Sequence, residues 1–258
     1  MGAVVFDRQI RGEGTSEAQW QAWPCLGELV QVSLDDLVPP ACRAVVIAPH
    51  PDDEVIGFGG LLAMLAARGS AILVVALTDG EASHPGSRLW PPHRLADARI
   101  GESRAGLRHL GVPPYSQCRL SLPDGKLAAC GEPLAQHLSE LLLPGDVVFS
   151  TWQLDGHPDH EAAGQTTARL CTQRGCRHWQ APVWMWHWAQ PGDTRVPWSS
   201  MRRLALPEHT LRQKAAALAV HRTQLAAQDT GAPAVLPGFA LARMRRGFEY
   251  FLPAGATP

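Results

Sequence analysis

Residues 43–54 of the chain read RAVVIAPHPDDE. The first half of this stretch is a short run rich in β-branched side chains, which predicts a buried strand over residues 43–48. The second half places one imidazole and three carboxylates within the five residues from His50 to Glu54. In an open α/β sheet, ligands bind beyond the carboxyl ends of the strands. The stretch therefore predicts an α/β fold with a polar site after its first core strand.

The alternation of a short apolar strand with a helix continues along the chain. We expect strands over residues 43–48, 71–77, 118–122, 147–151 and 183–188, and helices over 60–68, 94–110, 133–143, 159–174 and 208–228. Gly69, Gly111 and Gly175 directly follow three of these helices, as C-terminal glycines commonly do. Strands separated by single helices predict a mostly parallel sheet inside a three-layer α/β sandwich.

The first 42 residues lack this alternation. We expect them to form an N-terminal extension, followed by a single domain over residues 43–258. A chain of 258 residues is long enough for one large α/β domain. The six cysteines are scattered and include no C-x-x-C pair, which argues against a disulfide framework or a zinc ribbon.

Composition excludes several classes of partner. The formal net charge is -1, so the chain lacks the excess of basic residues that is typical of proteins that bind nucleic acid. The first residues lack the apolar core of a secretory signal, and no apolar run approaches the roughly 20 residues that span a bilayer. We therefore expect a soluble, cytoplasmic protein with no nucleic-acid partner and no membrane span. The sequence does not predict its oligomeric state.

A second segment repeats the chemistry of the first. His157-Pro158-Asp159-His160-Glu161 follows the expected strand at residues 147–151. In both segments the candidate ligands are three residues apart, and this spacing puts both side chains on one side of a helical turn. Proline at the second position is typical of a helix that begins there. Two loops far apart in sequence can thus converge on one crevice.

A divalent cation explains the density of acidic and imidazole groups, since carboxylates this close repel one another without one. Catalytic zinc sites use three protein ligands and leave one position open. The available set is His50, Asp53 and one or both of His157 and His160. A bound metal lowers the pKa of water to roughly 7. Asp52, which adjoins a ligand, is the natural proton acceptor.

These motifs resemble the LmbE-like (PIG-L) deacetylases. The first signature of that family is similar to residues 48–54 with the Gly-Phe-Gly-Gly at 57–60, and the second is similar to residues 157–160. Weaker resemblances lie at residues 77–81, 99–102 and 122–125, and Lys214 with residues 221–224 resembles the family's K…H-x-[ST]-Q element. Together they extend from residue 45 to residue 224.

The resemblance implies a Rossmann-like fold and a zinc hydrolase that removes an acyl group, usually acetyl, from an amino sugar. By this resemblance His50, Asp53 and His160 hold the metal. The substrate would be a small N-acetylated amino-sugar conjugate of the N-acetylglucosamine type. A set of two histidines and one carboxylate also suits Fe²⁺, so the sequence does not decide between the two metals.

The resemblance also implies roles for residues that do not bind metal. Asp52 would be the general base, His157 would stabilise the oxyanion, and Asp159 would orient His157. A separate group, Arg99, Asp124 and Glu81, is expected to contact the substrate.

One departure concerns the residue two positions before the second signature. Some sugar-thiol members of the family have a tyrosine there, whereas this chain has Asp155. The substrate can therefore differ, and a metal-dependent amidase acting on a larger amide conjugate is an alternative. A non-catalytic metal-binding regulatory protein is another. Finally, Trp184, Trp186 and Trp188 would share one face of the expected strand at 183–188, as core packing, a partner surface or a sugar-stacking wall.

Overall fold

The strand predicted at the start of the core lies near the centre of the sheet. The computed structural model describes residues 8–256, and in it β2 is buried throughout. The eight strands of the sheet are in the order β1-β7-β8-β6-β5-β2-β3-β4. Their bounds are β1 Val30–Val32, β2 Ala44–Ala48, β3 Ile72–Thr78, β4 Gln117–Leu122, β5 Val147–Thr151, β6 Arg177–Ala181, β7 Arg202–Ala205 and β8 Phe248–Pro253. Only β8 makes antiparallel pairings among these strands, so the sheet is mostly parallel as predicted.

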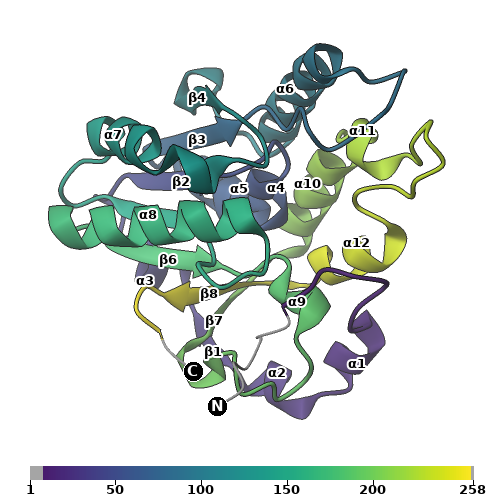
Figure 1. Cartoon of the computed structure of the whole chain (residues 1–258). Helices are drawn as coiled ribbons and strands as arrows, with labels where there is room; N and C mark the ends of the chain where they lie inside the picture. The colour runs from purple at the N-terminus through teal and green to yellow at the C-terminus, as the bar shows by residue number, and fades with distance from the viewer. Residues whose placement is uncertain (1–7, 257–258) are drawn as a thin grey trace, which may run out of the picture.

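Helices cover both faces of the sheet (Figure 1). The helices are α1 Glu17–Gln21, α2 Pro24–Glu28, α3 Leu34–Leu37, α4 Asp53–Ile56, α5 Gly59–Arg68, α6 Pro92–His109, α7 Gly131–Leu141, α8 Pro158–Arg174, α9 Met185–Trp188, α10 Glu208–Ala219, α11 Arg222–Leu225 and α12 Gly238–Met244. Short 3-10 turns are η1 Pro114–Ser116, η2 Leu127–Cys130 and η3 Trp198–Ser200.

Alternating side chains of the central strands build two apolar layers. Val45 and Ile47 of β2 pack with residues of α7 and α8. Val46 of β2 and Phe149 of β5 pack on the opposite face, with residues of α4, α5, α6 and α10. This period of two is the pattern of a strand that is buried on both faces. The three-layer α/β sandwich predicted from the sequence is therefore confirmed.

The order of the strands explains how the two His-Pro-Asp segments meet. From β2 the chain builds β3 and β4 on one side, and then returns to place β5 on the other side of β2. Strands β2 and β5 are parallel neighbours, so their carboxyl ends open at one edge. That reversal of strand order is where open α/β sheets form a crevice. The loop after β2 carries His50, and the loop after β5 carries His157.

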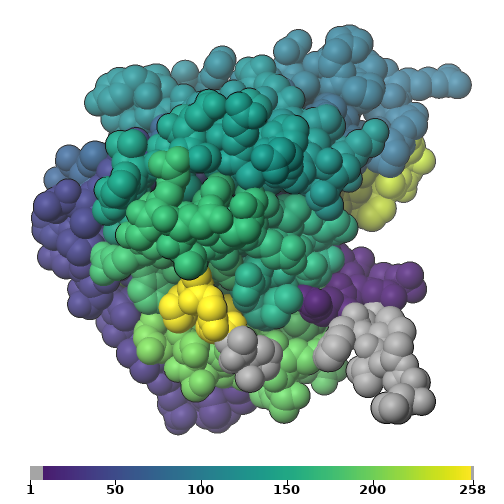
Figure 2. Space-filling model, turned by 60° about the vertical axis from the view of Figure 1, so that its left-hand side comes forward, coloured from purple at the N-terminus to yellow at the C-terminus, as the bar shows by residue number. Residues whose placement is uncertain are grey.

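Residues 8–42 are packed into the same body. Strand β1 pairs with β7 and forms one edge of the eight-stranded sheet. Trp20 and Leu26 are buried in a third apolar cluster with Trp186 and Tyr250. In Figure 2, purple N-terminal and yellow C-terminal residues lie against green residues from the middle of the chain.

Two sequence predictions at the C-terminal half are wrong. The expected strand at 183–188 is a bend followed by the short helix α9, because the Asp155 carboxylate accepts the backbone N–H groups of Val183, Trp184 and Met185. The strand of this region is β6, which ends before Pro182. The expected helix at 208–228 divides into α10 and α11, with His221 between them. The three indoles therefore do not share a strand face.

No helix within residues 8–256 is both long enough and apolar enough to cross a membrane.

Candidate active site

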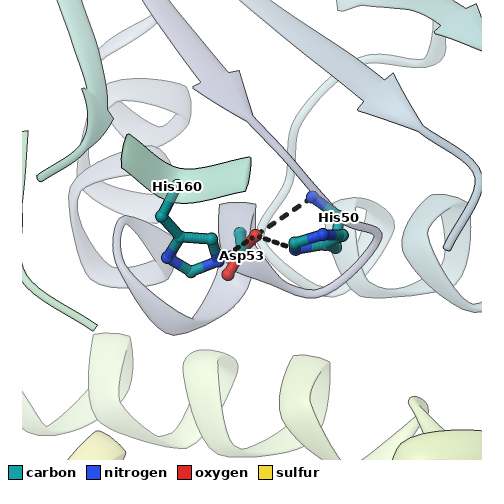
Figure 3. A group of neighbouring side chains, drawn as sticks. All are labelled: His50, Asp53 and His160. Atoms are coloured by element: carbon teal, nitrogen blue, oxygen red, sulfur yellow. Dashed lines mark hydrogen bonds and ion pairs between the residues drawn. The ribbon is translucent and has the colours of Figure 1, made fainter. Parts of the chain in front are cut away.

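The two loops bring three candidate metal ligands together. His50 and Asp53 come from the first loop and the start of α4, and His160 comes from the first turn of α8 (Figure 3). One oxygen of Asp53, Oδ2, lies 3.1 Å from His50 Nδ1 and 3.2 Å from His160 Nε2. The three ligand atoms lie within 4.8 Å of one another. Two imidazole nitrogens and one carboxylate suit zinc or Fe²⁺, so the residues present fit a divalent metal.

The other nitrogen of His50 has its own acceptors. His50 Nε2 lies 3.2 Å from Asp159 Oδ2 and 3.3 Å from Asp124 Oδ1. A neutral imidazole carries one N–H, and a carboxylate acceptor at Nε2 leaves the lone pair on Nδ1. Nδ1 is the atom that faces Asp53. The two acidic groups therefore orient His50 as a ligand, as carboxylates behind metal-binding histidines commonly do.

Asp155 supports the second histidine in the same way. Its Oδ2 lies 2.8 Å from His160 Nδ1, which leaves Nε2 to face Asp53. The Asp155 side chain is fully buried, and its two oxygens also accept the three backbone N–H groups before α9. Sequence reasoning noted Asp155 only as a departure from the family pattern. A carboxylate five residues before a ligand histidine, on a loop that enters a helix, was the available signal.

Asp52, the predicted base, sits in a strained and buried position. Its backbone φ is 153°, outside the usual range for a residue with a side chain, at a cost of roughly 1–3 kcal/mol. Asp52 Oδ2 lies 3.1 Å from Arg99 Nη2, and Arg99 also donates to the carbonyls of Pro51 and Gly80. A Cβ on Gly80 would lie 2.1 Å from Arg99 Nη1, so only glycine leaves room for the guanidinium.

Arg99 was predicted to contact substrate, and the structure places it against Asp52. Both side chains are buried, and both line the pocket described below. Arg99 Nε has no hydrogen-bond partner among the described residues. The guanidinium thus holds the Asp52 carboxylate in place, and its Nε–H is left without an acceptor among these residues.

His157 occupies the same place in its loop as His50 does in the first loop, but its ring has a different role. It caps α8, and its Nδ1 accepts the backbone N–H of Asp159 at 3.3 Å. The proton of the neutral ring therefore resides on Nε2, which is left free to donate. The predicted contact through the Asp159 carboxylate is not found. That carboxylate instead accepts the N–H groups of Gly125 and Leu127 and faces His50.

Burial and neighbouring charges separate the pKa values of the titratable groups in the site. Burial, together with the charges of His160 and His50, lowers the pKa of His157 to about 4. Burial also raises the pKa of Asp52 to about 7; Arg99 opposes this rise and Asp53 adds to it. For His160, burial alone would lower the pKa, but Asp53 and Asp155 outweigh it and raise the pKa to about 9. His157 is thus the neutral imidazole of the group, and a bound cation would displace protons from the ligands.

The site opens into a pocket of about 260 Å³. Its lining has a polar part, which includes Ser83, Asp124 and Gly125, and an apolar part. The apolar part consists of Ile56, Val183, Trp184, Val235 and Leu236. The mixed lining suits a sugar ring, which has polar edges and apolar faces.

Of the two other residues predicted to contact substrate, Asp124 lines the pocket, whereas Glu81 supports Asp124 from outside it. Asp124 lines the pocket, where Oδ1 faces His50 and Oδ2 accepts the backbone N–H of Ala82. Glu81 accepts the backbone N–H of Asp124 at 2.9 Å and does not line the pocket. Sequence reasoning gave no pocket role to Gln224, which lines the wall beside Leu236. The family-like H-x-T-Q segment was the only signal for it.

The sequence is similar to those of known de-N-acetylases. Residues 45–171 match the family PIG-L, described as GlcNAc-PI de-N-acetylase. The chain is 30% identical over 251 residues to the 1D-myo-inositol 2-acetamido-2-deoxy-alpha-D-glucopyranoside deacetylase of Corynebacterium diphtheriae, covering 78% of this chain and 82% of the relative. It is 31% identical over 126 residues to the diacetylchitobiose deacetylase of Thermococcus kodakarensis, covering 47% of this chain and 46% of the relative.

Among solved structures, teicoplanin deacetylase Orf2 in a zinc-inhibited form has the same fold. The TM-score is 0.64 at 17% identity, with 82% of this chain and 97% of the other covered. The N,N'-diacetylchitobiose deacetylase of Pyrococcus horikoshii gives a TM-score of 0.52 at 23% identity, with 75% and 76% covered. With both signatures inside the matched region and the relative from C. diphtheriae aligned along most of its length, this chain belongs to the PIG-L (LmbE-like) family of de-N-acetylases.

Proposed function

We propose that this protein is a zinc-dependent N-deacetylase that acts on a small amino-sugar conjugate of the N-acetylglucosamine type. One observation carries the proposal: a buried acid, Asp52, and an imidazole with a low pKa, His157, line the same sugar-sized pocket as the three candidate ligand groups. The named activities of the relatives from C. diphtheriae and T. kodakarensis support the same chemistry.

The ligands His50, Asp53 and His160 would hold the metal, which when bound polarises an amide carbonyl and makes water more acidic. Asp52 accepts the proton from the attacking water, since its carboxylate is fixed beside the ligands by Arg99. The Nε2–H of His157 donates to the oxygen that becomes negative in the tetrahedral transition state. Asp52 then returns the proton to the leaving amine nitrogen, and acetate and the free amino sugar depart.

The test of the base is an Asp52→Ala variant. We expect it to retain bound metal, because Asp52 is not one of the ligand groups, and to lose nearly all turnover. Metal content is measured by elemental analysis and turnover by acetate release. Turnover like that of the unmodified protein would remove Asp52 from the mechanism.

The substrate and the metal are tested by a single screen. N-acetylglucosamine and its conjugates are incubated with protein loaded with Zn²⁺ or Fe²⁺, and acetate and amine are both measured. Release of an acid larger than acetate would favour the amidase alternative. Purified protein that contains no divalent ion and hydrolyses none of the conjugates would favour a regulatory protein.

A further inference from the structure

We propose that Gln224 recognises a hydroxyl group of the substrate sugar, and that Glu102 and Thr223 fix Gln224 so that it can only accept a hydrogen bond. The inference rests on the proposed function, since it assigns a specificity element within the same pocket. Glu102 lies on α6, whereas Thr223 and Gln224 lie on α11, 121 and 122 positions later in the sequence. Glu102 and Thr223, which the proposed mechanism does not use, thus contact each other next to the pocket residue Gln224.

Gln224 has a buried acceptor without a partner. Its side chain is 0% exposed to solvent and lines the pocket that contains His50 and Asp52. Oε1 forms no hydrogen bond with any of the described residues. A buried amide oxygen without a partner costs roughly 1–3 kcal/mol. A donor that enters the pocket would relieve this cost.

The direction of the hydrogen bonds follows from Glu102. The two oxygens of its carboxylate accept the backbone N–H of Thr223 at 2.9 Å and the Thr223 hydroxyl at 2.6 Å. A hydroxyl has only one hydrogen, and here Glu102 takes it. Thr223 Oγ1 can therefore only accept from Gln224, whose Nε2 lies 2.9 Å away. The amide NH₂ must face Thr223, so Oε1 is the unpaired end of a side chain that belongs to the pocket lining.

The backbone around Gln224 is held from both sides. Leu236, itself on the pocket wall, donates its backbone N–H to the Gln224 carbonyl at 2.9 Å. His84 Nε2 lies 3.1 Å from the Thr223 carbonyl and acts as its donor. The amide can therefore change its direction only if Thr223 changes the direction of its hydroxyl. Glu102 prevents this, because a carboxylate cannot donate.

Because Gln224 Oε1 can only accept a hydrogen bond, it favours substrates that have a hydroxyl donor at the matching position. A sugar hydroxyl donates to Oε1, whereas hydrogen at the same carbon leaves Oε1 unpaired, and fluorine places two acceptors against each other. The most active N-acetylglucosamine conjugate is therefore compared with its 3-, 4- and 6-deoxy and deoxyfluoro analogues. We expect one position at which deoxygenation lowers kcat/KM by about 10- to 100-fold and fluorination lowers it at least as much.

The Gln224→Met variant removes the amide at similar size. We expect kcat/KM for the parent sugar to fall by about 10- to 100-fold, mainly through KM, and the sensitive position to lose its sensitivity. Gln136→Met on the exposed face of α7 is the matched control and keeps the full pattern. A Gln224→Met variant that discriminates among the analogues as the unmodified protein does would overturn the proposal.

Glu102→Gln tests the direction itself. Its amide can donate to Thr223 Oγ1, which frees the Thr223 hydroxyl to donate to Gln224 and lets the Gln224 NH₂ turn to the pocket. We expect this variant to accept the fluoro analogue at the sensitive position better than the deoxy analogue. Thr223→Val is expected to lose the discrimination, and Thr223→Ser to restore it. Unchanged preference in Glu102→Gln would contradict the assigned roles of Glu102 and Thr223.

The outcomes separate this inference from the proposed function. If the metal-loaded protein releases acetate from none of the conjugates, the proposed deacetylase activity fails. If it releases acetate and no deoxy analogue differs from the parent by more than a few fold, the activity stands and the role of Gln224 is overturned.

Discussion

The loop that begins at His50 and the loop that begins at His157 have the same first three residues and different local structures. Both follow buried parallel strands that are neighbours in the sheet. The first loop passes through Asp52, at a φ of 153°, into the four-residue helix α4. The second enters the 17-residue helix α8 with His157 as its N-cap. In the proposed site the first histidine of the first loop is a metal ligand, whereas the first histidine of the second loop caps a helix and keeps an Nε2–H free to donate.

The fourth residue and the backbone account for this difference. Asp53 and His160 occupy the fourth positions and both face the metal site. In the first loop the unusual φ at Asp52 accompanies a turn that also brings His50 Nδ1 to the ligand group. In the second loop the regular helix start occupies His157 Nδ1 with a backbone N–H. Two nearly identical four-residue segments thus differ in function. The first supplies two candidate ligands, and the second supplies one candidate ligand and one hydrogen-bond donor.

The largest effect is expected from Asp53→Ala in the first loop. Asp53 Oδ2 is the atom that both ligand histidines face, so its loss leaves two imidazoles without the carboxylate. We expect metal content and acetate release both to fall to the level of protein stripped with a chelator. A variant that retained its full metal content would place the site elsewhere, for example among His50, Asp124 and Asp159.

His157→Ala in the second loop is expected to separate metal binding from catalysis. The metal should stay, because His157 is outside the ligand group, and kcat should fall by about 10²- to 10³-fold with the loss of an oxyanion donor. Elemental analysis and acetate release measured on one preparation give both quantities. Loss of metal along with activity would show that the two loops each supply two ligands, which ends the contrast drawn above.

The strands and the ligand spacing behind this contrast could be predicted from local sequence, whereas the choice of His160 over His157 as a ligand came only from the family resemblance. The strand at 44–48 and the strand at 147–151 are short β-branched or apolar runs, and the ligand spacing falls at helix starts. The direction of the Asp159 carboxylate toward His50 could not be predicted, since it depends on how the turn at Gly125 packs against α8. The contact of Arg99 with Asp52 was not predicted for the same reason: Arg99 is placed by the carbonyls of Pro51 and Gly80, which come from two other loops. Its contact with substrate stays a prediction.

The C-terminal half was harder to predict. Strand β8 joins β6 and β7 by antiparallel pairing, which a repeating strand–helix pattern does not suggest. The Trp-rich segment has the alternation of a strand, but tertiary contacts with Asp155 turn it into a helix start. Propensity was overridden there by one buried carboxylate.

Asp155→Asn is expected to weaken the second loop alone, by an intermediate amount. An amide cannot match the carboxylate that accepts from His160 Nδ1, and outer-shell losses of this kind lower metal affinity by about 10- to 100-fold. The affinity is measured by competition with a chromogenic chelator. Asp97→Asn, at an exposed position on α6, is the control and should leave the affinity unchanged. An equal affinity in Asp155→Asn would mean that His160 does not depend on Asp155 for its orientation.

The smallest effect on catalysis is expected from a change in the buried Lys214–Glu249 pair, which contacts the helices that follow the first loop. Lys214 donates to the Ile56 carbonyl at the end of α4 and to Glu249 Oε1, while Glu249 accepts the N–H groups of Gly60 and Leu61 at the start of α5. Lys214→Met leaves Glu249 buried and unpaired, so unfolding in urea should show a loss of roughly 3–5 kcal/mol in stability.

The same variant should lose only a few fold in turnover per folded molecule, since Lys214 does not line the pocket that holds the ligands. Adding Glu249→Gln to Lys214→Met removes the unpaired charge and should recover part of the lost stability. Lys214 bonds the Ile56 carbonyl at the end of the helix that Asp52 precedes, so we expect destabilisation together with a modest loss of turnover. A fully stable Lys214→Met variant would show that the Lys214–Glu249 pair contributes little to stability. The bond from Arg99 to the Pro51 carbonyl would then be the main support of the first loop.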